Sequence, residues 1–272
     1  MEARLPALLL GLLQGTTEFL PVSSSGHLAL AKLLFSIEDA PLAYDVLLHF
    51  ATMLATLVYF GRDILSLLME WLAGFTSADL RGEGWRTGWA VLAGTAVTAM
   101  IGLPLKPVVV MAAEMPWAVG AGLLLTAALL WGASLSHRAG EGREGSVSPL
   151  KGALVGIAQG FAVLPGVSRS GATMVAGLKL GMGSGEAFRL SFLMSVPAVL
   201  GATLLEARGL LPLGTGGWAV VTLPEGWVAG MMVAFASGLC SLALLRRMVA
   251  AGRWRPFAVY CALAGIAAIF LT

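Results

Sequence analysis

Long apolar runs, separated by short polar connections, dominate the pattern of this 272-residue chain. A bilayer core about 30 Å thick requires about 20 apolar residues in helical form. Six stretches meet that length and predict spanning helices, at about 42–61, 86–105, 116–136, 186–207, 222–245 and 255–271. The pattern therefore predicts an all-α integral membrane protein.

Two further apolar regions, 5–35 and 150–181, are interrupted midway by glycine, proline and serine. Each is long enough to enter the membrane as a helix, break, and return as a second helix. Irregular backbone at that depth is tolerated only where protein or a water-filled cavity surrounds it. We therefore expect two re-entrant helical hairpins that meet inside the protein.

The two interrupted regions carry the same succession of short motifs. The first reads LQGTTEFLPVSSSGH and the second reads LVGIAQGFAVLPGVSRSGAT, so each has Gln-Gly, then Leu-Pro, then a Ser-rich turn closed by Ser-Gly. Three predicted spans follow each copy, and because three is odd, the second copy must be inserted upside down. We predict one membrane domain, 1–272, built as an inverted-topology repeat of about 1–136 and 150–272 around a central polar site.

Composition agrees with this membrane assignment. Hydrophobic residues make up 58% of the chain and charged residues only 12%, whereas soluble domains carry roughly a quarter charged residues. The net charge of +2 is not arranged as a basic stripe, so no nucleic-acid partner is expected. The two cysteines, Cys240 and Cys261, lie singly in apolar segments and are predicted to be small buried hydrophobes.

The distribution of Lys and Arg predicts the orientation, because cytoplasmic connections carry the excess of these residues. If each hairpin returns to its own side, four basic residues fall on one side and twelve on the other, and Arg169 lies within the second hairpin. We therefore expect the side with twelve to be cytoplasmic and both termini to lie outside the cytoplasm. The smaller group is Arg4, Lys32, Lys106 and Arg208, and the larger is Arg62, Arg81, Arg86, Arg138, Arg143, Lys151, Lys179, Arg189, Arg246, Arg247, Arg253 and Arg255.

The first hairpin places two oxygen-bearing side chains on one helix face. Gln14 and Glu18 are four residues apart and therefore lie next to each other on the helix. Their amide and carboxylate oxygens suit a hard divalent cation such as Mg²⁺ or Ca²⁺. Pro21 is predicted to end this helix just after Leu20.

A serine-rich turn follows that proline. With its glycine, the turn is predicted to begin a second half-helix whose free N–H groups point at an anion. His27 follows Ser24 by three residues, so its ring is expected to reach the Ser24 hydroxyl. A serine with a nearby base is a candidate nucleophile. The other residues of the turn are candidate substrate-binding residues, namely Ser23, Ser25 and Gly26.

The second hairpin contributes Arg169 instead of a histidine. An unpaired arginine at membrane depth costs on the order of several kcal/mol, and its forked guanidinium matches phosphate oxygens. Combined with Glu18, Ser24 and His27, it predicts the transfer or hydrolysis of a phosphoryl group, where positioning and charge neutralisation dominate. Small and hydroxyl residues around the arginine are predicted to bind substrate, namely Gly166, Ser168, Ser170, Gly171 and Thr173.

These residues also have structural interpretations. Serine and glycine in membrane helices commonly serve packing, Glu18 and Arg169 can pair as an internal strut, and His27 can be a hydrogen-bonded core histidine. Asp45 and His49, which are also four apart, are expected to have a structural or supporting role. The occurrence of reactive residues in both copies of the repeat nevertheless favours one shared site.

Two segments, EFLPVSSSGH and LPGVSRSGAT, closely resemble the signature segments of the bacterial undecaprenyl-diphosphate phosphatase family, also called bacitracin-resistance proteins. The flanking GLKLGMGSGEAFRLSFLMSVPAVLGA is similar to that family too, so the resemblance extends over essentially the whole chain. It implies hydrolysis of undecaprenyl diphosphate to the monophosphate and inorganic phosphate, with a divalent cation, to recycle the lipid carrier for cell-wall synthesis. It also implies bacitracin tolerance, because bacitracin sequesters the same diphosphate.

By the resemblance, the family's functional residues fall on Gln14 and Glu18 (acidic pair), Ser24 with Ser23 as the adjacent rival, His27 and Arg169. Gln14 departs from the commoner two-glutamate form and removes one anionic metal ligand. The resemblance further implies the bacterial inner membrane, with membrane lipids and a polyprenyl diphosphate substrate as partners, and a homodimer is compatible with the sequence.

Three other classes of protein share parts of this pattern. Acid-phosphatase-like lipid phosphatases carry similar motifs, but Val175 stands where their nucleophilic histidine would be. An inverted repeat with broken helices is also transporter architecture, so a flippase of a polyprenyl phosphate is the main alternative. The pair of Ser24 and His27 favours an enzyme, because transport requires no nucleophile. A membrane scaffold would leave Glu18 and Arg169 without a role beyond pairing.

Overall fold

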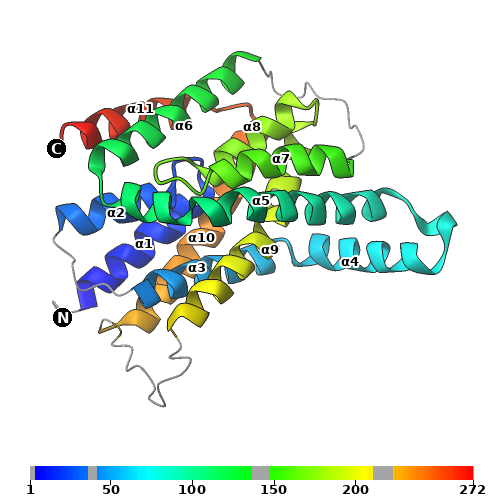
Figure 1. Cartoon of the computed structure of the whole chain (residues 1–272), viewed down its shortest axis with the longest axis horizontal. Helices are drawn as coiled ribbons and strands as arrows, with labels where there is room; N and C mark the ends of the chain where they lie inside the picture. The colour runs from blue at the N-terminus through cyan, green and yellow to red at the C-terminus, as the bar shows by residue number, and fades with distance from the viewer. Residues whose placement is uncertain (1–3, 36–41, 137–146, 211–222, 224, 272) are drawn as a thin grey trace.

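The computed structural model of the chain describes residues 4–35, 42–136, 147–210, 223 and 225–271. In these residues the regular structure is entirely helical, as predicted (Figure 1). In chain order the helices are α1 (Leu5–Phe19), α2 (Ser24–Leu34), α3 (Leu42–Tyr59), α4 (Gly61–Thr76), the short 3-10 helix η2 (Ala78–Leu80), α5 (Glu83–Ala113), α6 (Pro116–Ser136), α7 (Pro149–Phe161), α8 (Arg169–Lys179), α9 (Ser184–Leu210), α10 (Trp227–Ala250) and α11 (Arg255–Ile269).

Both interrupted regions form a pair of short helices with a break between them. Leu20 ends α1 in an extended conformation because Pro21 follows it, and α2 begins only at Ser24. In the same way, α7 and α8 are separated by the turn at 162–168. The breaks therefore lie where glycine, proline and serine interrupt the apolar pattern.

Several helices have the length and composition of membrane spans. The helices α5, α6, α9 and α10 are long and apolar enough to cross a membrane, while α11 is a shorter apolar helix. The predicted span at 42–61 corresponds to α3, which ends at Tyr59. The chain then bends by 73° and continues as α4. The protein is thus a multi-pass membrane protein, and α4 is an element that the apolar pattern did not predict.

One hairpin projects from the body of the molecule. The helices α4 and α5 run side by side and form the extension at the right of Figure 1. With 31 residues, α5 is about 46 Å long, well beyond the predicted 86–105 and longer than a hydrocarbon core of about 30 Å. Because of this extra length, the hairpin of α4 and α5 extends beyond the other helices.

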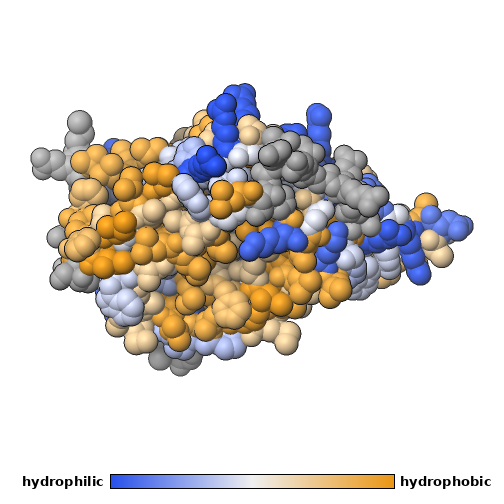
Figure 2. Space-filling view, turned by 90° about the horizontal axis from the view of Figure 1, so that it is seen from above, coloured by the Kyte–Doolittle hydropathy of each residue, from blue (hydrophilic) through white to orange (hydrophobic). Residues whose placement is uncertain are grey.

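The outer surface is largely apolar. Figure 2 shows a broad hydrophobic face, with hydrophilic side chains gathered along one edge and at one end. Large side chains such as Met100 and Leu263 are exposed, as expected where lipid replaces water. Cys261 is buried, as predicted, but the prediction for Cys240 was wrong because its side chain is exposed on α10. Next to lipid, a small apolar side chain gains little from burial in the protein.

Small residues bring three helix pairs into close contact. On the contact of α7 with α5, a Cβ added at Gly156 would lie 2.4 Å from the carbonyl oxygen of Gly94. The pair α1 and α10 meets in the same way, since a Cβ at Gly11 would lie 2.2 Å from the carbonyl oxygen of Gly230. The helices α6 and α11 approach at Gly120. Such contacts are the usual basis of helix association in lipid, where close packing replaces the hydrophobic effect.

We expect Gly156→Ala to lower the midpoint of thermal unfolding in detergent, because its new Cβ would overlap the α5 backbone. The matched control is Gly132→Ala on α6, where an added Cβ meets nothing within 4 Å. Alanine is favoured over glycine in a helix by about 1 kcal/mol, so the control should be neutral or stabilising. Equal midpoints for the two variants would contradict the close contact of α5 and α7.

Candidate active site

The turn between α1 and α2 is held in an unusual backbone conformation. Ser23 has a φ of 69°, and it is the only non-glycine residue with positive φ in the described part of the chain. Its hydroxyl caps α2 by accepting a hydrogen bond from the Gly26 N–H at 3.4 Å. The next residue, Ser24, is consequently the first residue of α2 and lies at its N-terminus.

The turn between α7 and α8 is built similarly. Gly166 has a φ of +83°, and Ser168 caps α8 by accepting from the Gly171 N–H at 3.1 Å. Thr126, on α6, fixes this turn from outside. Its hydroxyl donates to the Gly166 carbonyl and accepts from the Ser168 N–H, both at 2.9 Å. Arg169 is therefore the first residue of α8.

The two turns are in direct contact. A Cβ at Gly26 would lie 2.9 Å from the Cα of Gly166, and one at Gly171 would lie 3.2 Å from the Cβ of Pro21. The absence of side chains at these glycines allows the N-termini of α2 and α8 to come together. Because free N–H groups and the helix dipole favour negative charge at each N-terminus, the meeting point is suited to an anion.

Glu18 is the centre of the hydrogen-bonded cluster at this point. The Ser24 hydroxyl donates to Oε2 of Glu18 at 2.5 Å, and Nη2 of Arg169 donates to Oε1, also at 2.5 Å. Nε2 of Gln14 donates to Oε2 at 3.1 Å. Glu18 is only 9% exposed, so the pair with Arg169 is a buried ion pair. The structure thus joins the four residues from both hairpins around one carboxylate.

The neighbouring helix α3 adds a polar stripe. Nε2 of His49 lies 3.8 Å from Oε2 of Glu18, and its Nδ1 is bonded to the carbonyl of Asp45 at 2.9 Å. Asp45 itself forms an ion pair with Lys32 of α2. Thr52 lies one turn further and accepts from Gln14 at 3.5 Å. In the sequence, these residues are recognisable from their helical spacing on one face of α3. Only the pair of Asp45 and His49 was identified from the sequence.

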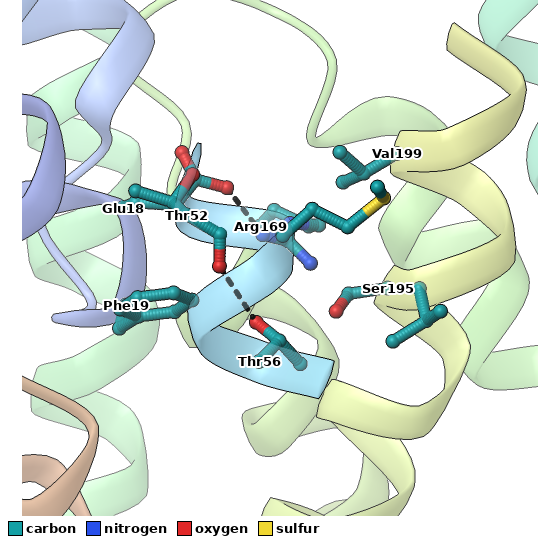
Figure 3. Close-up of a pocket in the computed structure, with 9 residues that line it drawn as sticks. Glu18, Phe19, Thr52, Thr56, Arg169, Ser195 and Val199 are labelled. Atoms are coloured by element: carbon teal, nitrogen blue, oxygen red, sulfur yellow. Dashed lines mark hydrogen bonds and ion pairs between the residues drawn. The ribbon is translucent and has the colours of Figure 1, made fainter. Parts of the chain in front are cut away.

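A pocket lies beside the Glu18–Arg169 pair (Figure 3). The ion pair and Phe19 of α1 form one side of it, and helices α3 and α9 form the rest. The lining therefore combines charged and hydroxyl groups with apolar side chains. The polar members are Glu18, Arg169, Thr52, Thr56 and Ser195, and the apolar members are Phe19, Met53, Val196 and Val199.

The expected contact between His27 and Ser24 is not present. Nδ1 of His27 is bonded to the carbonyl of Ser23 at 2.7 Å, and Nε2 is bonded to the hydroxyl of Tyr260 at 2.7 Å. Both ring nitrogens are therefore used elsewhere. The Ser23 carbonyl accepts both the backbone N–H of His27 at 3.2 Å and the ring Nδ1, while the Ser24 hydroxyl donates to Glu18. In this geometry the base within reach of Ser24 is a carboxylate.

The remaining candidate residues surround the two turns. The hydroxyls of Ser23 and Ser25 are 3.3 Å apart, and those of Ser168 and Ser170 are 3.2 Å apart. The hydroxyl of Thr173 lies 2.6 Å from that of Ser191 on α9 and does not line the pocket. Ser168, Ser170 and Thr173 are buried. Their hydroxyls thus contact protein groups that shape the turns and support α8.

The fold and this site define a class of protein: a multi-pass membrane protein in which two broken helices bring a serine, a carboxylate and an arginine together at their turns. The sequence also shows the family to which the chain belongs. The chain belongs to the family described as bacitracin resistance protein BacA, whose model matches residues 7–267. The family expected from the two signature segments is thereby confirmed.

Individual relatives cover nearly the full chain. An undecaprenyl-diphosphatase of Desulfosudis oleivorans is 41% identical over 264 residues, which cover 94% of each chain. An undecaprenyl-diphosphatase of Methanosphaera stadtmanae is 37% identical and covers 98% of each chain, and one of Syntrophotalea carbinolica is 40% identical and covers 96% of each.

The buried ion pair yields a stability prediction. We expect Arg169→Met to destabilise the protein, because removing one partner of a buried pair costs about 3–5 kcal/mol. Adding Glu18→Gln should recover much of this loss, because no uncompensated charge then remains. Thermal unfolding of both single variants and the double variant in one detergent measures this. Simple addition of the two single losses would argue against the pair.

Proposed function

We propose that this chain hydrolyses undecaprenyl diphosphate to undecaprenyl phosphate and inorganic phosphate. The relatives carry the name of that enzyme. The observation that carries the proposal is the contact of Ser24 and Arg169 with the two oxygens of Glu18 at the meeting point of two helix N-termini. Such a site offers a nucleophile, an acceptor for its proton and donors for phosphate oxygens.

The residues have distinct roles in the proposed reaction. Arg169 and the N-terminal N–H groups of α2 and α8 bind the diphosphate oxygens and hold the terminal phosphorus near Ser24. Ser24 Oγ forms a bond to that phosphorus as its proton passes to Oε2 of Glu18. The bond from phosphorus to the bridging oxygen breaks, and its electron pair leaves with undecaprenyl phosphate. Water then attacks the phosphorus, the bond from phosphorus to Ser24 Oγ breaks, and Oγ takes back the proton from Glu18 as inorganic phosphate is released.

The pocket suits an amphiphilic substrate. Its charged side at Glu18 and Arg169 faces the phosphates, whereas Val196 and Val199 of α9 provide apolar contacts. A polyprenyl tail has to remain in lipid while its diphosphate reacts. A reactive turn within the membrane protein, next to an apolar helix face, accommodates both parts.

A divalent cation, Mg²⁺ or Ca²⁺, is part of this proposal. The described residues include no group of three His, Cys, Asp or Glu side chains that would hold a metal ion. Oxygen ligands are nevertheless present, since Oε1 of Gln14 is buried with no hydrogen-bond partner beside the Glu18 carboxylate. Gln14 and Glu18 would hold the cation together with substrate oxygens. When bound, it would neutralise phosphate charge.

We expect Gln14→Glu to keep activity and to lower the Mg²⁺ or Ca²⁺ concentration that gives half-maximal rate, because a second carboxylate attracts the cation more strongly than an amide. Glu18→Gln should abolish activity at ordinary metal concentration. Metal titrations of phosphate release by the purified variants measure both effects. An unchanged metal requirement in Gln14→Glu would show that this residue does not bind the metal.

We also propose that the chain is an inverted repeat with both termini outside the cytoplasm of a bacterial inner membrane. Corresponding helix pairs support the repeat, because α1 packs on α10 through glycines as α7 packs on α5. The start of α1, the end of α11 and the junction of α5 with α6 lie at the same end of Figure 1. Cysteine labelling from each side of the membrane tests this orientation. In the cell, the reaction would recycle the lipid carrier and confer bacitracin tolerance.

The direct test is phosphate release from undecaprenyl diphosphate by the purified protein in detergent micelles. A flippase without hydrolytic activity releases none, because micelles have no separate compartments. We expect Ser24→Ala to lower kcat by about 10²-fold or more, the usual scale for lost nucleophilic or acid–base catalysis. Ser134→Ala is the matched control, since the Ser134 hydroxyl bonds the Trp131 carbonyl of its own helix, α6, and Ser134 does not line the pocket. Full turnover in Ser24→Ala would overturn the role of Ser24.

A further inference from the structure

Tyr260 is connected to the reactive turn although it lies near the other end of the chain. Its ring, on α11, stacks on that of His27 with centroids 5.5 Å apart and an interplanar angle of 10°. Its hydroxyl is 2.7 Å from Nε2 of His27, whose Nδ1 is 2.7 Å from the Ser23 carbonyl. These contacts form one continuous chain of hydrogen bonds from α11 to the turn.

The hydrogen bonds fix the direction of each donor. The Ser23 carbonyl can only accept, so Nδ1 of His27 carries the proton that it donates. In the neutral ring, Nε2 is then an acceptor, and the Tyr260 hydroxyl donates to it. Tyr260 thus selects the tautomer of His27 that binds the Ser23 carbonyl.

Ser23 requires such support. A positive φ in a residue with a side chain is strained and persists only where the surroundings determine it. The conformation of Ser23 matters because the next residue, Ser24, places its hydroxyl on Glu18. The Ser23 carbonyl accepts both the backbone N–H of His27 at 3.2 Å and the ring Nδ1 at 2.7 Å. Loss of the ring's hydrogen bond would leave the His27 N–H to hold this carbonyl, so the turn could relax and move the nucleophile.

We propose that Tyr260 is a positioning residue for Ser24, acting through His27 and the Ser23 carbonyl. This inference rests on the proposed function. It gives the pair of α6 and α11 a common task, because Thr126 on α6 bonds the backbone of the second turn directly, while Tyr260 on α11 bonds His27, which in turn bonds the Ser23 carbonyl of the first. Each reactive turn is then held by one member of that helix pair.

The test uses Tyr260→Phe, which removes the hydroxyl and keeps the stacked ring. We expect kcat for phosphate release to fall about tenfold with KM nearly unchanged, because Arg169 and the helix N-termini still bind the phosphates. Tyr59→Phe is the control, since Tyr59 ends α3 and its ring packs against Phe60. It should retain wild-type kcat and KM. A raised KM with unchanged kcat in Tyr260→Phe would overturn the proposal and indicate a substrate contact instead.

A double variant tests whether Tyr260 acts through the histidine. If it does, Tyr260→Phe combined with His27→Gln should have the same kcat as His27→Gln alone, because the connection is already broken. Multiplication of the two separate losses, or wild-type kcat in Tyr260→Phe, would overturn the proposal. Wild-type protein that releases no phosphate would instead refute the proposed function, so the two failures are distinguishable.

Discussion

The buried pair of Arg169 and Glu18 is the interaction on which the site depends. A charge inside a membrane protein has to be compensated, because lipid cannot solvate it. Each charge comes from a different hairpin, and they meet at 2.5 Å. The pair therefore joins the hairpins and also keeps a cation and a carboxylate ready beside the serine. In the proposed reaction, a phosphate that binds Arg169 would compete with Glu18 for the guanidinium, which would link substrate binding to the contact between the hairpins.

This pairing requires that two turns approach closely, and the approach depends on glycine. Gly26 and Gly166 leave no space between the turns for a side chain. The caps supplied by Ser23 and Ser168 then start the two helices, and each satisfies one N–H of the first turn, that of Gly26 in α2 and that of Gly171 in α8. Serine in these motifs thus caps a helix at positions 23 and 168 and, in the proposed reaction, is the nucleophile at position 24.

The helix pair α6 and α11 supports this centre from outside. Thr126 bonds the second turn and Tyr260 bonds His27 beside the first. Close contact of α6 with α11 near Gly120 and Gly265 keeps these two side chains on one rigid support. A reactive centre made of irregular backbone is in this way held by regular helices, as precise positioning requires.

The class of fold and the candidate site residues could be predicted from the sequence. Apolar runs of membrane length, the two interrupted regions and their repeated motifs predicted the helices and the breaks, because hydrophobic length and proline or glycine act locally. The same motifs identified Glu18, Ser24 and Arg169 as candidate site residues. Local spacing also predicted that His27 would reach Ser24, and this was wrong, because the ring nitrogens of His27 bond the Ser23 carbonyl and the Tyr260 hydroxyl while the Ser24 hydroxyl bonds Glu18.

Which distant groups meet depends on how the helices pack in the tertiary structure. The tertiary structure added α4 after the first predicted span, at a bend of 73°, and placed His49 next to Glu18. It also brought Tyr260 to His27, across 233 positions of the chain. These contacts arise from helix packing, within the first half of the chain for His49 and Glu18 and between the two halves for His27 and Tyr260. Periodicity within one helix specifies which face is polar, but it does not specify which partner that face will meet.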